Sequence, residues 1–599
     1  MRHASADLMH DEKSLRKAID VHLIRRLWRY VRPYRGAVAG SFALLFAVSA
    51  VQLVQPYLVK LAIDRHIATR EFAGLGGLAA LFLAVLSAEF ALRYAQMFVL
   101  ERTGQHVIFD IRMHVFSHLQ ALPSAFFDRN SVGKLMTRVT SDVEALNEAF
   151  TSGLVLILAD LVKLAGIVVI LLWMDWRLAL VTFAVLPPML WLTFQFRTRV
   201  RRAYRAVRAR VAQLNAFLQE NVSGIRLVQL FNRQRASIDA FAEVNDGHLG
   251  AQLRGVRYDS TFSALAEMIG SWTVAAIVWA GGRRILSRSM TFGTLVAFID
   301  YAEKFFRPVQ ELSQRYTTMQ AAMASAERIF ELLDTEVTIR SPERPKSLPA
   351  QRRGEIVFEG VHFGYEPGVP VLRDVSFRLA PGERGAIVGW TGSGKSTLIR
   401  LLVRLYDPWE GRILLDGVDV RELDLQTLRR TVGVVLQEPF LFADSIRRNL
   451  DLGDPAVDEA RVRRAAEAVT ADRFIERLAD GYETEVRERG ANFSTGEKQL
   501  MSFARALAFD PAVLIMDEAT ASVDPATESR IQTALARVLE GRTSIVIAHR
   551  LATVRDADRI FVLHHGSLVE QGTHEELAAV EGGIYAALYR YQAVGGSLG

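Results

Sequence analysis

The sequence predicts a chain of two parts: an all-α domain of six membrane-spanning helices, followed by an α/β domain of the P-loop type. Two observations support this fold class. Between residues 37 and about 310, apolar runs follow one another, each near the ~20 residues that a helix needs to cross a bilayer. After about residue 340, short β-branched runs alternate with helical patterns, which is typical of a parallel sheet covered by helices.

The six apolar runs come in series, four of them clear and two weaker. A buried helix of a soluble protein would explain any single run, but it explains six in succession poorly. The runs occupy residues 37–57, 72–92, 153–174, 177–196, 262–282 and about 289–307.

The polar stretches between the runs predict the topology. Short links join runs one to two, three to four and five to six, whereas long helical stretches near 100–150 and 198–260 join the others. The second long stretch begins with a series of arginines. On its own, such a series would suggest that the chain binds nucleic acid. Directly after a membrane span, however, it follows the positive-inside rule. We therefore expect both long stretches and both termini in the cytoplasm, and no nucleic-acid partner.

The first 36 residues are polar and basic, with apolar residues spaced as on an amphipathic helix. This pattern predicts a helix that lies on the cytoplasmic face of the membrane. Within the spans, four ionisable residues stand out: Glu89, Asp160, Lys163 and Glu267. An internal ion pair, or a position near the interface, explains each of them better than a function does.

Composition excludes several kinds of chemistry. The chain has 599 residues, enough for two or three domains, and half of them are apolar. It contains no cysteine, so disulfides, zinc–thiolate sites, iron–sulfur clusters and cysteine nucleophiles are excluded.

The stretch GWTGSGKST (389–397) lies between a predicted strand and a predicted helix. It matches the pattern G-x-x-x-x-G-K-[ST] of a phosphate-binding loop. Lys395 is expected to reach the β- and γ-phosphates, and the Ser396 hydroxyl to bind Mg²⁺. The other residues expected to surround the nucleotide in this loop are Gly389, Thr391, Gly392, Ser393, Gly394 and Thr397.

Further polar residues follow other predicted strands. Asp517 and Glu518 end the apolar run AVLIMDEA. We expect Asp517 to hold Mg²⁺ and Glu518 to polarise the attacking water. Gln437 in VVLQEP can sense Mg²⁺ or that water, and His549 in VIAHR can contact the γ-phosphate. The predicted catalytic set is therefore Glu518, His549 and Gln437.

A second anion-binding pattern lies at FSTGEKQ, where small and hydroxyl residues precede an amphipathic helix. In chain order, GWTGSGKST, LQEP, FSTGEKQ, LIMDEA, SVD and AHR resemble the nucleotide-binding domain of an ABC transporter. The part with six runs resembles the membrane domain of exporters in that family. FFDRNSVGKLMTRVTSDV (126–143) and QENVSGIRLVQLF (219–231) resemble the loops whose coupling helices dock on the nucleotide domains. The resemblance covers nearly the whole chain.

The resemblance implies further roles. Tyr365 would stack on adenine, and Asp524 would lie where two nucleotide domains meet. The segment FSTGE (493–497), the signature of this chain, would bind the γ-phosphate of ATP held by the opposite domain. It would do so through Ser494, Thr495 and Gly496, so the chain would function as half of a dimer. TEVRERG (484–490) resembles a loop specific to exporters, although Arg487 stands where Gly is common.

The signature departs from the usual LSGGQ at three positions, Phe493, Thr495 and Glu497. Thr495 restricts the backbone more than Gly would, and Glu497 brings negative charge to a phosphate site unless it faces away. Homodimer and heterodimer both stay open. The heterodimer is slightly favoured, because an intact Glu518 beside an altered signature is half of the pattern found in paired chains.

These observations predict four segments: an amphipathic segment (1–36), a membrane domain (37–330), a linker (331–354) and a nucleotide-binding domain (355–599). The resemblance implies an exporter of the bacterial inner membrane that uses ATP and Mg²⁺. It would move an amphiphilic or hydrophobic substrate, drug-like or lipid, in contact with membrane lipid. The alternatives are an importer with the exporter fold, a lipid flippase and a soluble ABC ATPase. The sequence does not identify the substrate.

Overall fold

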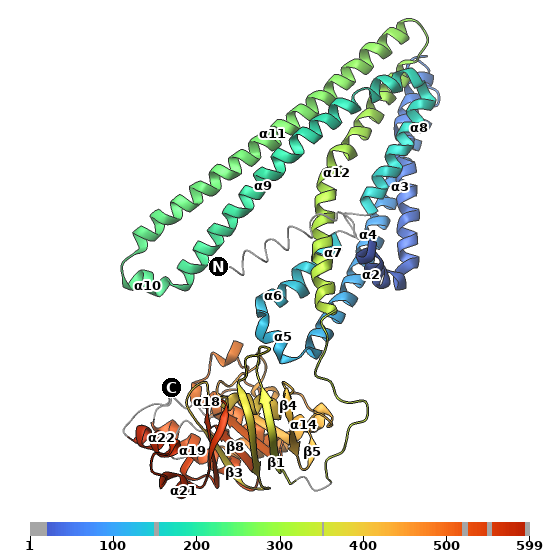
Figure 1. The fold of residues 1–599 in the computed structure, drawn as a ribbon. Helices are drawn as coiled ribbons and strands as arrows, with labels where there is room; N and C mark the ends of the chain where they lie inside the picture. Colours follow the sequence, from blue (N-terminus) through green and yellow to red (C-terminus); the bar gives the residue numbers. More distant parts are fainter. Residues whose placement is uncertain (1–20, 149–154, 350–352, 518–524, 548–553, 594–599) are drawn as a thin grey trace. The chain divides into compact units, whose positions relative to one another are not determined.

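The computed structural model describes residues 21–148, 155–349, 353–517, 525–547 and 554–593 (Figure 1). The chain divides into two compact units. The helical unit comprises Met1–His118 and Leu135–Asp334. The second unit comprises Leu119–Lys134 and Thr335–Gly599, and it is called the ATPase unit below after the role that the sequence predicts for it. The predicted fold class is confirmed, because one unit is helical and the other contains sheets flanked by helices.

The helical unit begins with short α2 and continues with long helices joined by brief links. In chain order its elements are α2 (Val21–Val31), η1 (Arg32–Tyr34), α3 (Arg35–Ala62), η2 (Ile63–Ile67), α4 (Leu75–Ala121), α6 (Val132–Thr137), η3 (Arg138–Asp142), α7 (Val143–Glu148), α8 (Val155–Phe183), α9 (Leu186–Ser223), α10 (Ile225–Leu230), α11 (Gln234–Leu286) and α12 (Phe292–Leu333).

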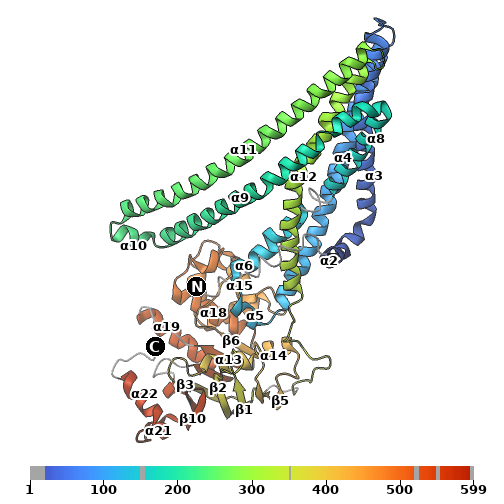
Figure 2. The same ribbon diagram turned by 45° about the horizontal axis from the view of Figure 1, so that its top comes forward.

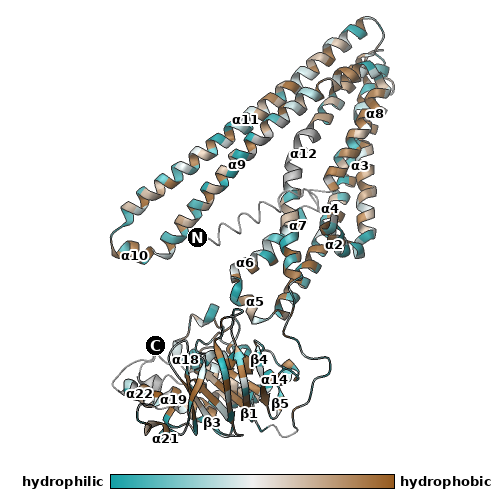
Figure 3. Cartoon of the chain, viewed as in Figure 1, coloured by the Kyte–Doolittle hydropathy of each residue, from teal (hydrophilic) through white to brown (hydrophobic). Residues whose placement is uncertain are grey.

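Six long helices, α3, α4, α8, α9, α11 and α12, hold most of the six apolar runs. The fourth run (177–196) is divided between the end of α8 and the start of α9. Within the described residues, four helices are long and apolar enough to cross a membrane: His22–Ile67, Leu75–Ala121, Ile157–Phe183 and Gln234–Leu286. Hydrophobic residues are concentrated along α3, α4 and α8, and hydrophilic ones are frequent along α9 and α11 toward α10 (Figure 3). The long polar stretches therefore extend the spanning helices.

The turn between the third and fourth runs lies at Asp175, where α8 has one residue with extended backbone (φ −163°, ψ 103°). The Asp175 carboxylate accepts hydrogen bonds from the backbone N–H groups of Arg177 at 3.0 Å and Leu178 at 3.1 Å. It therefore caps the helix that follows. Arg284 of α11 pairs with the same carboxylate at 2.5 Å, which joins this turn to the next hairpin.

The core of the helical unit lies among α3, α8, α11 and α12. Phe298 and Tyr301 of α12 are among its largest fully buried side chains, and the Tyr301 hydroxyl donates to the Leu53 carbonyl of α3. α9 and α11 lie side by side and are joined by α10 (Figures 1 and 2). None of the most apolar window of α4 is buried, so this face is available to lipid or to another chain.

The ATPase unit combines two sheets with helices. In chain order its elements are α5 (Ser124–Arg129), β1 (Ile356–Phe363), β2 (Leu372–Leu379), β3 (Arg384–Val388), α13 (Lys395–Leu402), β4 (Glu410–Leu415), β5 (Val418–Asp419), α14 (Leu425–Thr431), β6 (Val432–Val435), α15 (Ile446–Asp451), α16 (Glu459–Ala468), α17 (Asp472–Ile475), η5 (Gly481–Glu483), η6 (Glu488–Gly490), α18 (Thr495–Ala508), β7 (Val513–Asp517), α19 (Pro525–Leu539), β8 (Thr543–Ile547), β9 (Arg559–His564), β10 (Ser567–Gly572), α21 (His574–Ala578) and α22 (Ile584–Ala593).

The strand order of the larger sheet explains where the site lies. Its order is β10-β9-β3-β8-β7-β6, parallel except for the antiparallel edge strand β10. The smaller sheet, β2-β1-β4-β5, is antiparallel and shares a core with α13. Because β3, β8 and β7 are parallel neighbours, their carboxyl ends meet at one edge. Ligands bind at such edges in sheets of this type.

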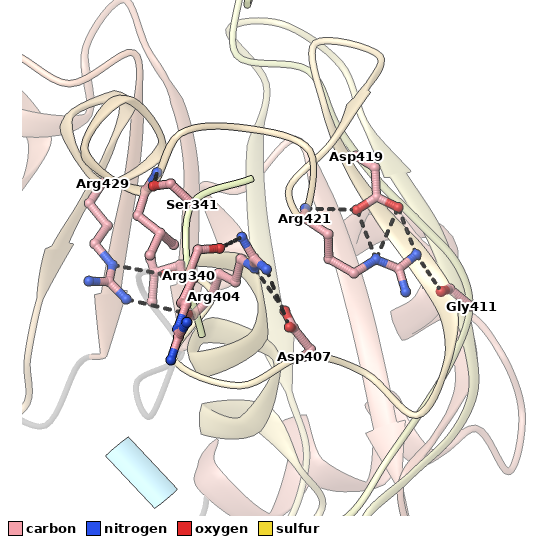
Figure 4. Close-up of polar contacts among 10 residues, drawn as sticks. Arg340, Ser341, Arg404, Asp407, Gly411, Asp419, Arg421 and Arg429 are labelled. Atoms are coloured by element: carbon pink, nitrogen blue, oxygen red, sulfur yellow. Dashed lines mark hydrogen bonds and ion pairs between the residues drawn. The ribbon is translucent and has the colours of Figure 1, made fainter. Parts of the chain in front are cut away.

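The residues that precede β1 belong to the ATPase unit and pack against the rest of it (Figure 4). The buried Arg404 donates to the Arg340 carbonyl at 3.0 Å and to the Asp407 carboxylate at 2.9 Å. Arg429 donates to the Arg404 carbonyl at 3.2 Å. Lys346 pairs with Glu422 at 2.8 Å. Hydrogen bonds to backbone therefore hold this segment in place before the first strand begins.

Arg505 connects α18 to α15 and to the residues that precede α15. Its guanidinium donates to the Asn449 carbonyl at 2.7 Å, to the Asn449 side-chain oxygen at 3.2 Å and to the Phe440 carbonyl at 3.0 Å. Burial lowers the pKa of Arg505, and the hydrogen bonds to carbonyl oxygens offset part of that cost. The interaction fixes the signature helix against α15.

We predict that Arg505→Met lowers the free energy of unfolding of the ATPase unit by roughly 3 kcal/mol, because three acceptors lose a charged donor. Thermal unfolding of the purified full-length chain measures this effect. Arg505→Lys should lose less, because it keeps a charged donor. Arg463→Met, which breaks an exposed pair with Glu459, is the matched control and should cost under about 0.5 kcal/mol. Equal losses in Arg505→Met and the control would contradict the prediction.

Candidate nucleotide-binding site

The loop between β3 and α13 is shaped by glycine. Gly394, the residue before α13, has a left-handed backbone with φ +103°. A Cβ there would lie 2.6 Å from a Leu372 methyl. Gly392 also has positive φ, +81°. A loop of this shape presents backbone N–H groups and the start of a helix to an anion. The strand–loop–helix context predicted for GWTGSGKST is present.

Lys395, the first residue of α13, is buried at the centre of this loop. Its ammonium group donates to the Gly389 carbonyl at 2.7 Å and to the Trp390 carbonyl at 3.1 Å. Desolvation lowers the pKa of Lys395, and the nearby Asp517 opposes that shift. Carbonyl dipoles compensate a buried cation only partly. An anion with several oxygens fits this position.

The Ser393 hydroxyl is a second sign of a ligand. Ser393 is 4% exposed, and its oxygen has no hydrogen-bond partner among the residues that the structure describes. Buried hydroxyl groups are normally satisfied. The hydroxyl lies in the loop that the sequence predicts to hold phosphate, and a phosphate oxygen would satisfy it.

The candidate Mg²⁺ position is formed by Ser396 and Asp517. The Ser396 hydroxyl, at the start of α13, lies 3.4 Å from an Asp517 carboxylate oxygen at the end of β7. Hydroxyl and carboxylate oxygens suit Mg²⁺, which usually takes one or two protein ligands together with phosphates and waters. Within the described residues, no group of three or more His, Asp or Glu could hold a metal alone. The residues present therefore fit a metal ion that arrives with a phosphate ligand.

The structure describes only some of the remaining predicted residues. Gln437 is exposed, two residues beyond the end of β6. Glu518, Asp524 and His549 lie outside the described residues. Their roles stay predictions, although β7 ends immediately before Glu518 and β8 ends two residues before His549.

Tyr365, the predicted adenine platform, follows β1 and lies against α13. Its hydroxyl is 3.0 Å from the Thr397 hydroxyl, so two of the residues predicted to bind the nucleotide are in contact. The Arg400 guanidinium lies over the ring, 5.6 Å from its centroid. The Tyr406 ring packs edge to face at 5.3 Å. Arg400 and Tyr406 were not predicted, since nothing in their local sequence separates them from ordinary residues near a helix end.

The signature segment caps its own helix. α18 begins at Thr495, and the preceding Ser494 and Glu497 form a reciprocal capping box. The Glu497 carboxylate accepts from the Ser494 N–H and the Ser494 hydroxyl, both at 2.8 Å. Glu497 therefore faces the helix N-terminus. Thr495 is the first helical residue and is exposed, so the helical backbone accommodates it without needing glycine.

Comparisons with known proteins agree with this geometry. Residues 38–309 match the family model described as ABC transporter transmembrane region, and residues 372–521 match the model described as ABC transporter. An uncharacterized ABC transporter ATP-binding protein of Bacillus subtilis, YknV, is 40% identical over 574 residues, covering 95% of this chain and 94% of the relative. An ATP-dependent lipid A-core flippase of Desulfotalea psychrophila is 34% identical, covering 95% and 99%.

A probable multidrug resistance ABC transporter ATP-binding/permease protein of Bacillus subtilis, YheH, is 37% identical, covering 86% of this chain and 76% of the relative. Among solved structures, a bacterial Atm1-family ABC exporter with ATP bound matches with a TM-score of 0.75 and 29% identity. That match covers 93% of this chain and 98% of the exporter chain.

We predict that Lys395→Gln weakens binding of Mg²⁺·ATP about 100-fold, because it removes the buried cation from the phosphate loop. Equilibrium binding to the full-length chain in lipid measures this effect. Lys346→Gln, which removes an exposed lysine of the same unit, is the matched control and should leave binding unchanged. Equal affinities of Lys395→Gln and the wild type would refute the phosphate site.

Proposed function

The chain belongs to the ABC transporter family. From this premise we propose that it is an ATP-hydrolysing half-transporter that works with a second, non-identical half. We propose that it moves an amphiphilic or hydrophobic substrate out of the cytoplasm or the inner leaflet. It is an ATPase-coupled exporter of the bacterial inner membrane, with its ATPase part in the cytoplasm.

The observation that supports the ATPase role most directly is the convergence of Lys395, Ser396 and Asp517 at one sheet edge. We propose that phosphate oxygens replace the Gly389 and Trp390 carbonyls as partners of Lys395. Ser396 and Asp517 would hold Mg²⁺, whose charge stabilises the phosphates during transfer. Glu518 is proposed to orient the attacking water, and Gln437 and His549 to contact the water or the γ-phosphate.

A second chain is needed because the signature belongs to the opposite ATP site in this family. Two exposed apolar surfaces of the helical unit support a partner. Leu227, Leu230 and Phe231, at and beside α10, are 63%, 78% and 69% exposed, and α10 lies in a stretch predicted to dock on a nucleotide domain. The apolar window of α4 is also unburied. A group of neighbouring apolar side chains that is this exposed is typical of an interaction surface.

The capping box of Glu497 favours a heterodimer. A phosphate at the start of α18 would need the donors of Ser494 that the Glu497 carboxylate already occupies. The phosphate would also be repelled by the negative charge of Glu497, which already occupies the position where the helix dipole favours an anion. A homodimer would place this signature in both ATP sites. In a heterodimer, the P-loop and Glu518 of this chain would face the signature of the other, different chain.

The substrate class rests on the relatives, one named as a lipid A-core flippase and another as a probable multidrug resistance transporter. Both names fit a substrate with apolar and polar parts. Transport into inverted vesicles would distinguish export from import, and a lipid labelled on its headgroup would distinguish flipping from drug transport.

We predict that the purified chain alone, in lipid, hydrolyses ATP slowly and that Glu518→Gln lowers even this rate by about 100-fold or more while ATP still binds. Release of inorganic phosphate measures turnover. Robust turnover by the chain alone, dependent on Glu518, would overturn the heterodimer in favour of a homodimer. A rate that Glu518→Gln leaves unchanged would overturn the catalytic role of Glu518.

We predict that Glu497→Gln raises the ATPase rate of the chain alone about threefold to tenfold, because it removes a negative charge from the start of α18 and keeps the cap. The rate at low ATP concentration measures this effect. Glu488→Gln, at an exposed carboxylate in nearby η6, is the matched control. A rise in neither variant would mean that the Glu497 charge does not limit the signature.

A further inference from the structure

The segment Leu119–Lys134 belongs to the ATPase unit, although α4 precedes it and the rest of the helical unit follows it. Three residues of its helix α5 make contacts there. Ala125 packs on the core shared by the two sheets. The Tyr406 hydroxyl donates to the Asp128 carboxylate, and Arg129 donates to the Tyr365 carbonyl at 3.1 Å. α5 therefore rests on the residue that the sequence predicts to stack on adenine.

Tyr365, Arg400, Tyr406, Asp128 and Arg129 form one set of contacts, the adenine-platform cluster. Arg400 lies over the Tyr365 ring, 3.4 Å from the Tyr365 hydroxyl and 3.9 Å from the Asp128 carboxylate. The buried Tyr406 packs on the Tyr365 ring and donates to Asp128. Tyr365 is thus held through its ring, its hydroxyl and its backbone carbonyl.

The Tyr406 hydroxyl is a dependable donor. Burial raises the pKa of Tyr406, and the hydrogen bond to Asp128 raises that pKa further. The hydroxyl therefore stays protonated at physiological pH and continues to donate. The Asp128 side chain is half exposed (51%), so the pair lies at the surface of the unit, where a displacement of α5 can break it without opening the core.

We propose that Tyr406, Asp128 and Arg400 are positioning residues for the adenine of ATP: they hold Tyr365 in place only while α5 is docked. This inference rests on the proposed function, which assigns adenine stacking to Tyr365. The affinity for ATP then depends on the position of α5. Because such coupling is reciprocal, bound adenine holds α5 as strongly as α5 supports the base. Lys395, Ser396 and Asp517 take no part in this link, whereas Thr397 of the phosphate loop lies 3.0 Å from the Tyr365 hydroxyl.

A merely structural anchor would not require this arrangement. α5 has only six residues, and contacts anywhere on the ATPase surface could hold it. Two of its side chains instead reach Tyr365, one directly through a backbone carbonyl and one through Tyr406. The cluster should therefore affect the part of ATP binding that depends on the base, and leave the part that depends on phosphate unchanged.

The test compares two ligands on the full-length chain in lipid nanodiscs: Mg²⁺·ATP and Mg²⁺·tripolyphosphate, which has no base. Tyr406→Phe removes one hydroxyl and keeps the ring, and Asp128→Asn keeps the shape of the side chain. We expect each variant to weaken ATP binding threefold to tenfold and to change tripolyphosphate binding less than 1.5-fold. Tyr482→Phe, at a partly buried tyrosine in contact with Arg463, is the matched control and should change neither.

A double-mutant cycle with Tyr365→Ala shows whether Tyr406 acts through Tyr365. In the Tyr365→Ala background, Tyr406→Phe should weaken ATP binding by less than 1.5-fold. An undiminished effect in that background, or equal weakening of ATP and tripolyphosphate, would overturn the inference. Weaker ATP binding in Tyr365→Ala with no change in Tyr406→Phe would overturn the inference alone. Unchanged ATP binding in Tyr365→Ala would overturn adenine stacking and the inference together.

Discussion

The ATPase unit depends on one constraint, a buried lysine ammonium group that donates, among the described residues, to carbonyl oxygens. Lys395 donates to two carbonyls of its own loop, and burial disfavours its charge. Glycine backbone shapes this loop, and the parallel strands β3 and β7 bring Asp517 beside it. Sheet order, loop shape and the lysine together prepare a place for a polyphosphate, which is the strongest compensation available to such a cation.

A helix N-terminus attracts an anion, and this attraction has opposite consequences at α13 and at α18. At α13 the buried Ser393 hydroxyl has no described partner, and the lysine offers positive charge. At α18 the chain supplies its own anion, Glu497, which occupies the donors of Ser494. A free N-terminus attracts phosphate, whereas one capped by a carboxylate repels it. This contrast is the basis of the proposed pairing with a second, non-identical half.

Local patterns predicted the spanning helices, the strands and the loop GWTGSGKST, because hydrophobic periodicity and glycine spacing act over a few residues. The orientation of Glu497 depended on a side-chain rotamer, which the sequence left open. Arg400, Tyr406 and Asp128 could not be found from sequence. The Tyr406–Asp128 contact spans 278 positions, and an arginine within a P-loop helix, such as Arg400, has many other uses. For the same reason, no sequence pattern separated the segment around α5 from the helical unit.

α13 connects these observations, since the helix that begins with the phosphate loop also holds both segments that lead to the helical unit. Arg400 within it contacts Asp128 of α5, and Arg404 just beyond it donates to the Arg340 carbonyl after α12. Eight residues of helix span about 12 Å. The helix therefore carries Lys395 at its start, and the contacts to both connecting segments lie near and just beyond its end.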